Sequence, residues 1–111
     1  MKYKIMMNLL LATSLFLVFS GAVYAEGDAA AAKEKNSMCV GCHGIEDWRT
    51  AFPVVYHVPK IGGQNEQYLI DALTQYKNGE RSHPSMKAIA ASLSEQDIKD
   101  FAAYYSGNAG N

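Results

Sequence analysis

Residues 39–43, Cys-Val-Gly-Cys-His, constrain this chain more than any other segment. Their two thiols and one imidazole stand at i, i+3 and i+4, so a helix would present all three on one face. C-x-x-C-H is the pattern of covalent haem attachment, in which each thiol adds to a vinyl group and the adjacent imidazole binds the iron. The sequence therefore predicts one haem c, with Cys39 and Cys42 as thioether links and His43 as the proximal iron ligand.

Two other uses of a C-x-x-C pair compete with haem attachment. A thioredoxin-like dithiol occurs where strands alternate with helices, and the residues around Cys39 do not have that order. A tetrahedral zinc site needs four ligands, and His57 and His83 would have to complete it without the usual H-x-x-x-H spacing. Haem attachment is the interpretation that the residues favour.

The start of the chain has the pattern of a secretory signal peptide. Two lysines precede an apolar run over residues 5–19, and the small-residue sequence Val23-Tyr24-Ala25 follows it. The apolar run is shorter than the roughly 20 residues that span a bilayer. We therefore expect residues 1–25 to be a cleaved signal peptide, residues 26–111 to be a single domain in the periplasm, and no stable membrane insertion after cleavage.

The charge of the exported part excludes some classes of partner. Residues 26–111 carry 8 Lys plus Arg and 11 Asp plus Glu, which gives a formal charge of −3. A nucleic-acid partner would require a basic stripe, and lipid binding would require a polybasic cluster. We expect neither partner.

Hydrophobic spacing predicts an all-α domain with long irregular connections. The expected helices run from Ala29 through the cysteine motif, from about Asn65 to Asn78, over one or two turns between Lys87 and Leu93, and from Ser94 to Tyr105. Asp28 and Ser94 are the expected N-caps, and glycines 44, 79 and 107 the expected ends. Residues 45–63 are expected to form a loop wrapped on the haem, and residues 81–85 a polar turn.

The second axial ligand of the iron decides what such a protein does, because a filled site transfers electrons and an open one binds small molecules. Met38 is next to Cys39 and cannot reach the opposite haem face. Met86 follows the polar turn, on a segment that can cross the distal face, and its soft thioether suits haem iron. Position favours Met86, while His57, His83 and an open site remain alternatives.

The residues resemble the class I c-type cytochromes, and most closely the short bacterial monohaem kind, the cytochrome c-553 or c4-like module. The resemblance covers nearly all of the exported part. Four blocks in this order carry it: residues 38–44, residues 59–64, residues 76–81 followed by Met86, and the closing helix over residues 98–105.

The resemblance implies the small class I cytochrome c fold, with three to five helices wrapped around one covalently bound haem. It implies that His43 is the proximal ligand and Met86 the distal one. It also implies that the carbonyl of Pro59 binds the other ring nitrogen of His43, which would fix the imidazole orientation. Tyr104 or Tyr105 would pack where the first and last helices cross.

The segment between Gly44 and Pro59 departs from the family pattern, because it holds large side chains where relatives carry small ones. These are Trp48, Phe52, Val54, Val55, Tyr56 and His57. Trp48 either donates to a haem propionate or simply packs, and the Val-Val-Tyr run is an alternative docking surface. Arg81 either pairs with a propionate or is solvated, and the sequence slightly favours solvation.

The function expected from these residues is that of a soluble periplasmic monohaem electron carrier, which is not an enzyme. Its partners would be other redox proteins, such as cytochromes, oxidases or dehydrogenases, met through transient contacts. Two alternatives remain: a haem c electron-transfer subunit of a periplasmic oxidoreductase complex, and an open-site gas-binding haem protein.

Overall fold

The computed structural model describes residues 26–52 and 55–107, so the expected signal peptide, residues 1–25, lies outside the described residues. Five α-helices and a two-stranded sheet make up the described part, which confirms the predicted helical fold class. Their bounds are α2 (Ala29–Lys35), α3 (Ser37–His43), β1 (Arg49–Thr50), β2 (Tyr56–His57), α4 (Glu66–Asn78), α5 (Pro84–Ala91) and α6 (Glu95–Ser106). Among the described helices, none has the length and apolar character needed to cross a membrane.

The first predicted helix is divided into two. Asp28 caps α2 as expected, since its Oδ1 accepts hydrogen bonds from the backbone N–H groups of Ala30 and Ala31. Asn36 then separates α2 from α3, and its buried side chain accepts a hydrogen bond from the Tyr105 hydroxyl. The prediction of one continuous helix was wrong because this contact, 69 residues apart in sequence, is invisible to local patterns.

Part of the predicted loop over residues 45–63 is a short hairpin. β1 and β2 pair antiparallel, with Arg49 opposite His57 and Thr50 opposite Tyr56. The N–H of Val58 donates to the Trp48 carbonyl at 2.9 Å and extends the pairing. β-branched and aromatic residues such as Thr50 and Tyr56 suit a strand, so the loop prediction missed a signal that was present but short.

The second predicted helix is confirmed as α4. Asn65 caps it by accepting a hydrogen bond from the Tyr68 N–H at 3.0 Å. Gly79 ends it with φ of +86°, a left-handed conformation that glycine adopts without steric cost. Both ends of α4 are therefore defined by local contacts, and the apolar residues that face the core lie between them.

Helix α5 begins earlier than the sequence pattern predicted. Pro84 occupies its first turn, where the missing N–H costs nothing, and the His83 side chain caps it by accepting from the Met86 N–H at 3.3 Å. His83 itself is extended, with φ of −162°, as expected for a residue before proline. The predicted polar turn over residues 81–85 was therefore too long, because Pro84 starts a helix here.

The last helix, α6, has the predicted capping box. The Ser94 hydroxyl accepts from the Asp97 N–H at 3.0 Å, and an Asp97 carboxylate oxygen accepts from the Ser94 N–H at 2.9 Å. The other carboxylate oxygen of Asp97 pairs with Lys35 of α2 at 2.6 Å. The start of α6 is thereby tied to the end of α2.

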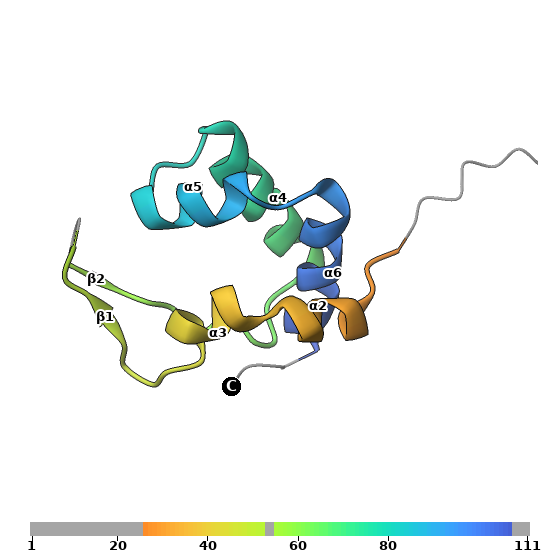
Figure 1. Cartoon of the computed structure of the whole chain (residues 1–111), viewed down its shortest axis with the longest axis horizontal. Helices are drawn as coiled ribbons and strands as arrows, with labels where there is room; N and C mark the ends of the chain where they lie inside the picture. The colour runs from red at the N-terminus through yellow and green to blue at the C-terminus, as the bar shows by residue number, and fades with distance from the viewer. Residues whose placement is uncertain (1–25, 53–54, 108–111) are drawn as a thin grey trace, which may run out of the picture.

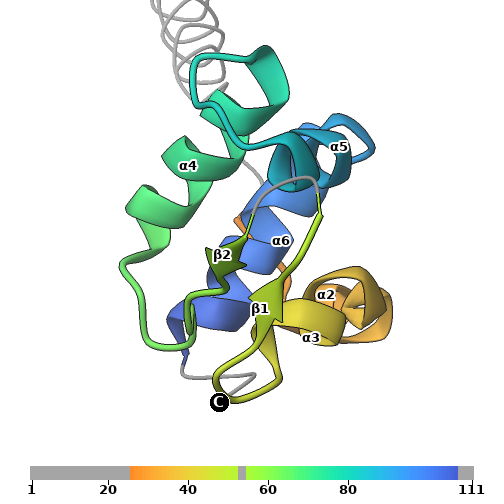
Figure 2. The same cartoon turned by 90° about the vertical axis from the view of Figure 1, so that its left-hand side faces the viewer.

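Helix α6 lies at the centre of the fold, between α4 and α2 (Figure 2), while the hairpin projects from the α3 side (Figure 1). α6 packs against α2 and α4, and α4 packs against α5. The buried core lies along these contacts and consists of Ala32, Leu69, Leu93, Ile98, Phe101, Ala102 and Tyr105. This core is small, and it lies around α6.

The segment just before α2 approaches α6 closely at Gly27. A Cβ on Gly27 would lie 2.2 Å from the Lys99 carbonyl oxygen and 2.9 Å from the Ala103 Cβ. Beside it, the buried Asp100 carboxylate accepts hydrogen bonds from the Asp28 N–H and from Gln96, both at 2.8 Å. The close approach places a backbone donor against a carboxylate in the core and fixes how the two ends of the domain meet.

Replacing Gly27 with alanine should destabilise the protein, because the new methyl group meets backbone that cannot give way. We expect a loss of about 1 to 3 kcal/mol in the free energy of unfolding, measured by urea titration of the mature protein. Gly107→Ala is the matched control, since its Cβ would find its nearest atom at 3.6 Å. Equal stability of the two variants would contradict the close packing at Gly27.

Asp97 should make stability depend on pH. Hydrogen bonds from Lys35 and then from Ser94 hold the pKa of the Asp97 carboxyl well below its ordinary value. Its contribution is therefore complete above the unfolded-state pKa of about 3.9 and is lost as pH falls towards the folded-state pKa. Asp97→Asn should cost about 1 kcal/mol at pH 7, chiefly through the cap, since Lys35 is half exposed.

The measurement is the free energy of unfolding as a function of pH. Between about pH 5 and pH 2 the wild-type value should fall more steeply than that of Asp97→Asn. Asp71→Asn, which removes an exposed carboxylate of α4, is the control and should follow the wild-type curve. Parallel curves for wild type and Asp97→Asn would contradict this role.

Candidate haem site

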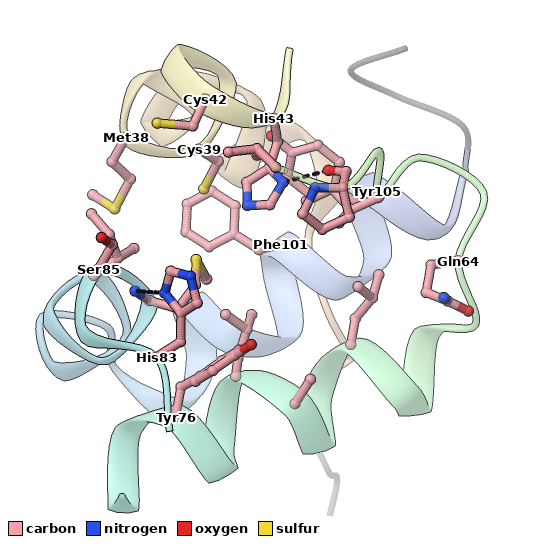
Figure 3. Close-up of a pocket in the computed structure, with 18 of the residues that line it drawn as sticks. Met38, Cys39, Cys42, His43, Gln64, Tyr76, His83, Ser85, Phe101 and Tyr105 are labelled. Atoms are coloured by element: carbon pink, nitrogen blue, oxygen red, sulfur yellow. Dashed lines mark hydrogen bonds between the residues drawn. The ribbon is translucent and has the colours of Figure 1, made fainter. Parts of the chain in front are cut away.

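One cavity of about 460 Å³ lies at the centre of the helices, on the side of the core away from α2. Side chains from α3, the hairpin, α4, α5 and α6 line it, and most of them are apolar or aromatic. Figure 3 shows Cys39, Cys42 and His43 entering from α3 on one side, with His83 and Tyr76 on the opposite side. The volume is in the range of pockets that bury a cofactor-sized ligand.

The cysteine motif occupies α3, and its three reactive side chains all line the cavity. Cys39, Cys42 and His43 share one face of this helix, as their spacing predicted. The helix ends directly after His43, where Gly44 leaves no room for a side chain: a Cβ there would lie 2.3 Å from a Val40 methyl group. The two thiols and the imidazole are thus presented together to one apolar space.

The His43 ring is held by a backbone carbonyl. Its Nδ1 lies 2.7 Å from the Pro59 oxygen, and because a carbonyl only accepts, Nδ1 must be the protonated nitrogen. The Nε2 lone pair is then free to bind a metal, and the hydrogen bond fixes the ring orientation. The family resemblance had predicted this hydrogen bond between the Pro59 carbonyl and the His43 ring.

The two thiols differ in their surroundings. Cys42 is exposed, whereas Cys39 is largely buried beside Tyr105, and burial raises the pKa of the Cys39 thiol to about 11. Redox dithiols and zinc sites use thiols whose pKa is lowered, because the thiolate is the reactive form. A thioether carries no charge, so burial of its sulfur imposes no such cost. The environment of Cys39 therefore suits a thioether better than a thiolate.

The candidates for the distal ligand are placed differently. Met86 on α5 and His83 before it both line the cavity, but the described lining residues do not include His57 of β2. His83 Nδ1 accepts the hydrogen bond that caps α5, so in its neutral form the proton is on Nε2 and no lone pair is left for a metal. Met38 also lines the cavity, from α3, the helix that carries His43.

The atypical loop separates into exposed and lining residues. Phe52 is 87% exposed and Val55 71% exposed, while Val54 lies outside the described residues. Trp48 is 41% exposed and is not part of the described cavity lining, but Thr50 and Tyr56 of the hairpin are. The sequence predicted that this segment would lie against the haem, but it did not predict the hairpin, because a pairing of two residues per strand leaves little periodicity to read.

Arg81 lines the cavity as well, and the choice between a propionate partner and solvation stays open at this point. The guanidinium lies over the Tyr76 ring at 4.9 Å from its centroid and donates to the Tyr68 hydroxyl at 3.2 Å. Two tyrosines of one helix therefore hold the cation, an arrangement that depends on the turn after α4 and is not apparent from spacing.

Comparison with known proteins gives relatives along most of the chain. It is 38% identical over 100 residues to cytochrome c4 of Pseudomonas aeruginosa, which is 90% of this chain and 48% of the relative. It is 40% identical over 83 residues to cytochrome c-554(548) of Halomonas halodenitrificans, 72% of this chain and 95% of that relative. A protein of Thiomonas intermedia named thiosulfate dehydrogenase electron acceptor is 33% identical over 88 residues, 78% of this chain and 39% of that relative. No family model matches the chain.

The helical fold and the C-x-x-C-H helix facing an apolar cavity are those of a c-type cytochrome. The chain belongs to the class I c-type cytochromes and is c4-like. It spans about half the length of the cytochromes c4 that it matches. Membership of this family implies covalently bound haem, and the cavity and its donor set, two thiols and an oriented imidazole, fit that group.

Proposed function

We propose that this chain is an exported, monohaem c-type cytochrome that carries single electrons between redox partners. The observation that carries the proposal is the oriented His43 ring beside two cysteines at the wall of an apolar cavity. Haem iron bound there supplies reversible one-electron chemistry. The proposal requires no general acid, base or nucleophile from the chain.

Four of the chain's own residues would hold the haem and its iron. Cys39 and Cys42 would hold the macrocycle through thioether bonds, and His43 would bind the iron through Nε2. Met86 would bind it from α5 on the opposite side. A Met and His pair favours a relatively high reduction potential, which suits delivery of electrons late in a respiratory chain.

The route of the electron follows from the unequal exposure of the two cysteines. Cys42 is exposed and Cys39 is largely buried, so the haem edge beside Cys42 would meet the solvent. Partners would approach this edge through a small interface and leave again quickly. Service as the electron acceptor of a dehydrogenase, as the name of the Thiomonas relative describes, is one form of this carrier role.

The proposed location is the periplasm, reached through residues 1–25 as a cleaved signal peptide. One C-x-x-C-H in the sequence corresponds to one haem per chain. The domain would then be residues 26–111, free of stable membrane insertion after cleavage.

The haem, its number and the cleavage site are tested together by the mass and spectrum of the protein exported with a maturation apparatus. We expect a coloured protein whose haem survives denaturation, with the mass of residues 26–111 plus one haem. Replacing Cys39 and Cys42 together with alanine should make the haem extractable, because no thioether remains. A colourless wild-type protein would overturn the proposal.

Met86 as distal ligand is tested by carbon monoxide binding to the reduced protein. Met86→Ala should open the site, bind carbon monoxide rapidly and lower the reduction potential, because the sixth ligand is lost. Met38→Ala is the matched control, since Met38 lines the same cavity from α3. Rapid binding by the wild type, or by the control alone, would show that Met86 is not a firm ligand.

A further inference from the structure

The turn after α4 holds Arg81 rigidly. Gly79 reverses the chain in the left-handed conformation, and the Asn78 side chain accepts from the Glu80 N–H at 3.1 Å. The Arg81 N–H then donates back to the Gln75 carbonyl at 3.1 Å. The backbone of Arg81 is therefore fixed against the last turn of α4.

The guanidinium is oriented as firmly as the backbone. Nη1 donates to the Tyr68 hydroxyl, and the group lies 4.9 Å from the Tyr76 ring centroid and 5.9 Å from that of Tyr68. The hydrogen bond to Tyr68 is the main cause of a raised pKa at Arg81, so the cation is always protonated. A guanidinium has five N–H donors, and this hydrogen bond uses one of them.

The described residues provide no carboxylate for this cation. Over residues 26–52 and 55–107, the ion pairs are Lys35 with Asp97 and Lys60 with Glu46. Lys60 also lines the cavity, and its ammonium pairs with Glu46 at 3.3 Å in an exposed ion pair. Arg81 is thus a half-buried, pre-oriented cation at the cavity that has no carboxylate partner among the described residues.

We infer that Arg81 is the propionate-binding residue of this cytochrome, with its guanidinium held between Tyr68 and Tyr76 to receive one haem carboxylate. The inference rests on the proposed function, since it assumes a haem in the cavity. Haem carries two carboxylates on the edge remote from its vinyl groups. Tyr76 lies across the cavity from Cys42 and His43 (Figure 3), and the Arg81 guanidinium lies over the Tyr76 ring. An arginine fork can bind a carboxylate with two parallel hydrogen bonds.

A propionate paired in this way would stay ionised to a lower pH than an unpaired one, because the opposite charge stabilises its anion. Its protonation removes a negative charge near the iron and raises the reduction potential. The pH at which the potential begins to rise therefore reports the partner of the propionate. A side chain that merely packs would leave that pH unchanged.

The experiment measures the midpoint potential of the haem-loaded protein against pH. In Arg81→Gln the inflection should move up by about 1 to 3 pH units relative to wild type. Arg81→Lys, which keeps the charge without the fork, and Tyr68→Phe, which frees the guanidinium, should give smaller shifts in the same direction. Lys33→Gln removes an equal charge from the exposed surface of α2 and should leave the inflection in place.

Superimposable pH profiles for wild type and Arg81→Gln, with a normal c-type spectrum in both, would overturn the assignment of Arg81 and leave the proposed function intact. The assignment would also be overturned if Lys33→Gln shifted the inflection as much as Arg81→Gln. If Arg81→Gln does not fold, unshifted profiles for Arg81→Lys and Tyr68→Phe would overturn the assignment instead. A wild-type protein without covalent haem would overturn the proposed function and this inference with it.

Discussion

The crossing of α2 over α6 is the contact on which the rest of the domain depends. Gly27 lets the backbones meet, Asp100 accepts a backbone N–H there, and Lys35 pairs with Asp97 further along. Each of these is a short-range restraint between helices from opposite ends of the chain. Together they hold α3, which continues from α2, at a fixed position relative to the side of α6 that lines the cavity.

The polar groups around the cavity orient side chains in an otherwise apolar space. A carbonyl sets the tautomer of His43, a capping bond occupies His83, and two tyrosine rings align Arg81. In each case a hydrogen bond or ring contact restricts the side chain to one tautomer or one orientation. The apolar core of the described residues is small, so a macrocycle that fills the cavity would add greatly to the buried apolar surface.

How much the sequence predicted depended on whether the decisive contact was local. The caps of α2 and α6 could be predicted from Asp28 and Ser94 because a cap acts within three residues. The break at Asn36 could not be predicted, because it depends on Tyr105, 69 residues later. The orientation of Arg81 could not be predicted either, because it depends on Tyr68, 13 residues earlier. The C-x-x-C-H motif was readable because covalent chemistry requires those side chains at that spacing, whereas the ligand opposite it has no such local pattern.

Asn36 has a consequence for the order in which this domain can assemble. Its side chain meets Tyr105, 69 residues later, and Asp28 meets Asp100, 72 residues later. Contacts of such separation close nearly the whole domain as one loop, and the entropy of that closure is lost before the contacts repay it. The junction between α2 and α3 is therefore fixed only after α6 has packed against it, although Asn36 lies near the start of the domain.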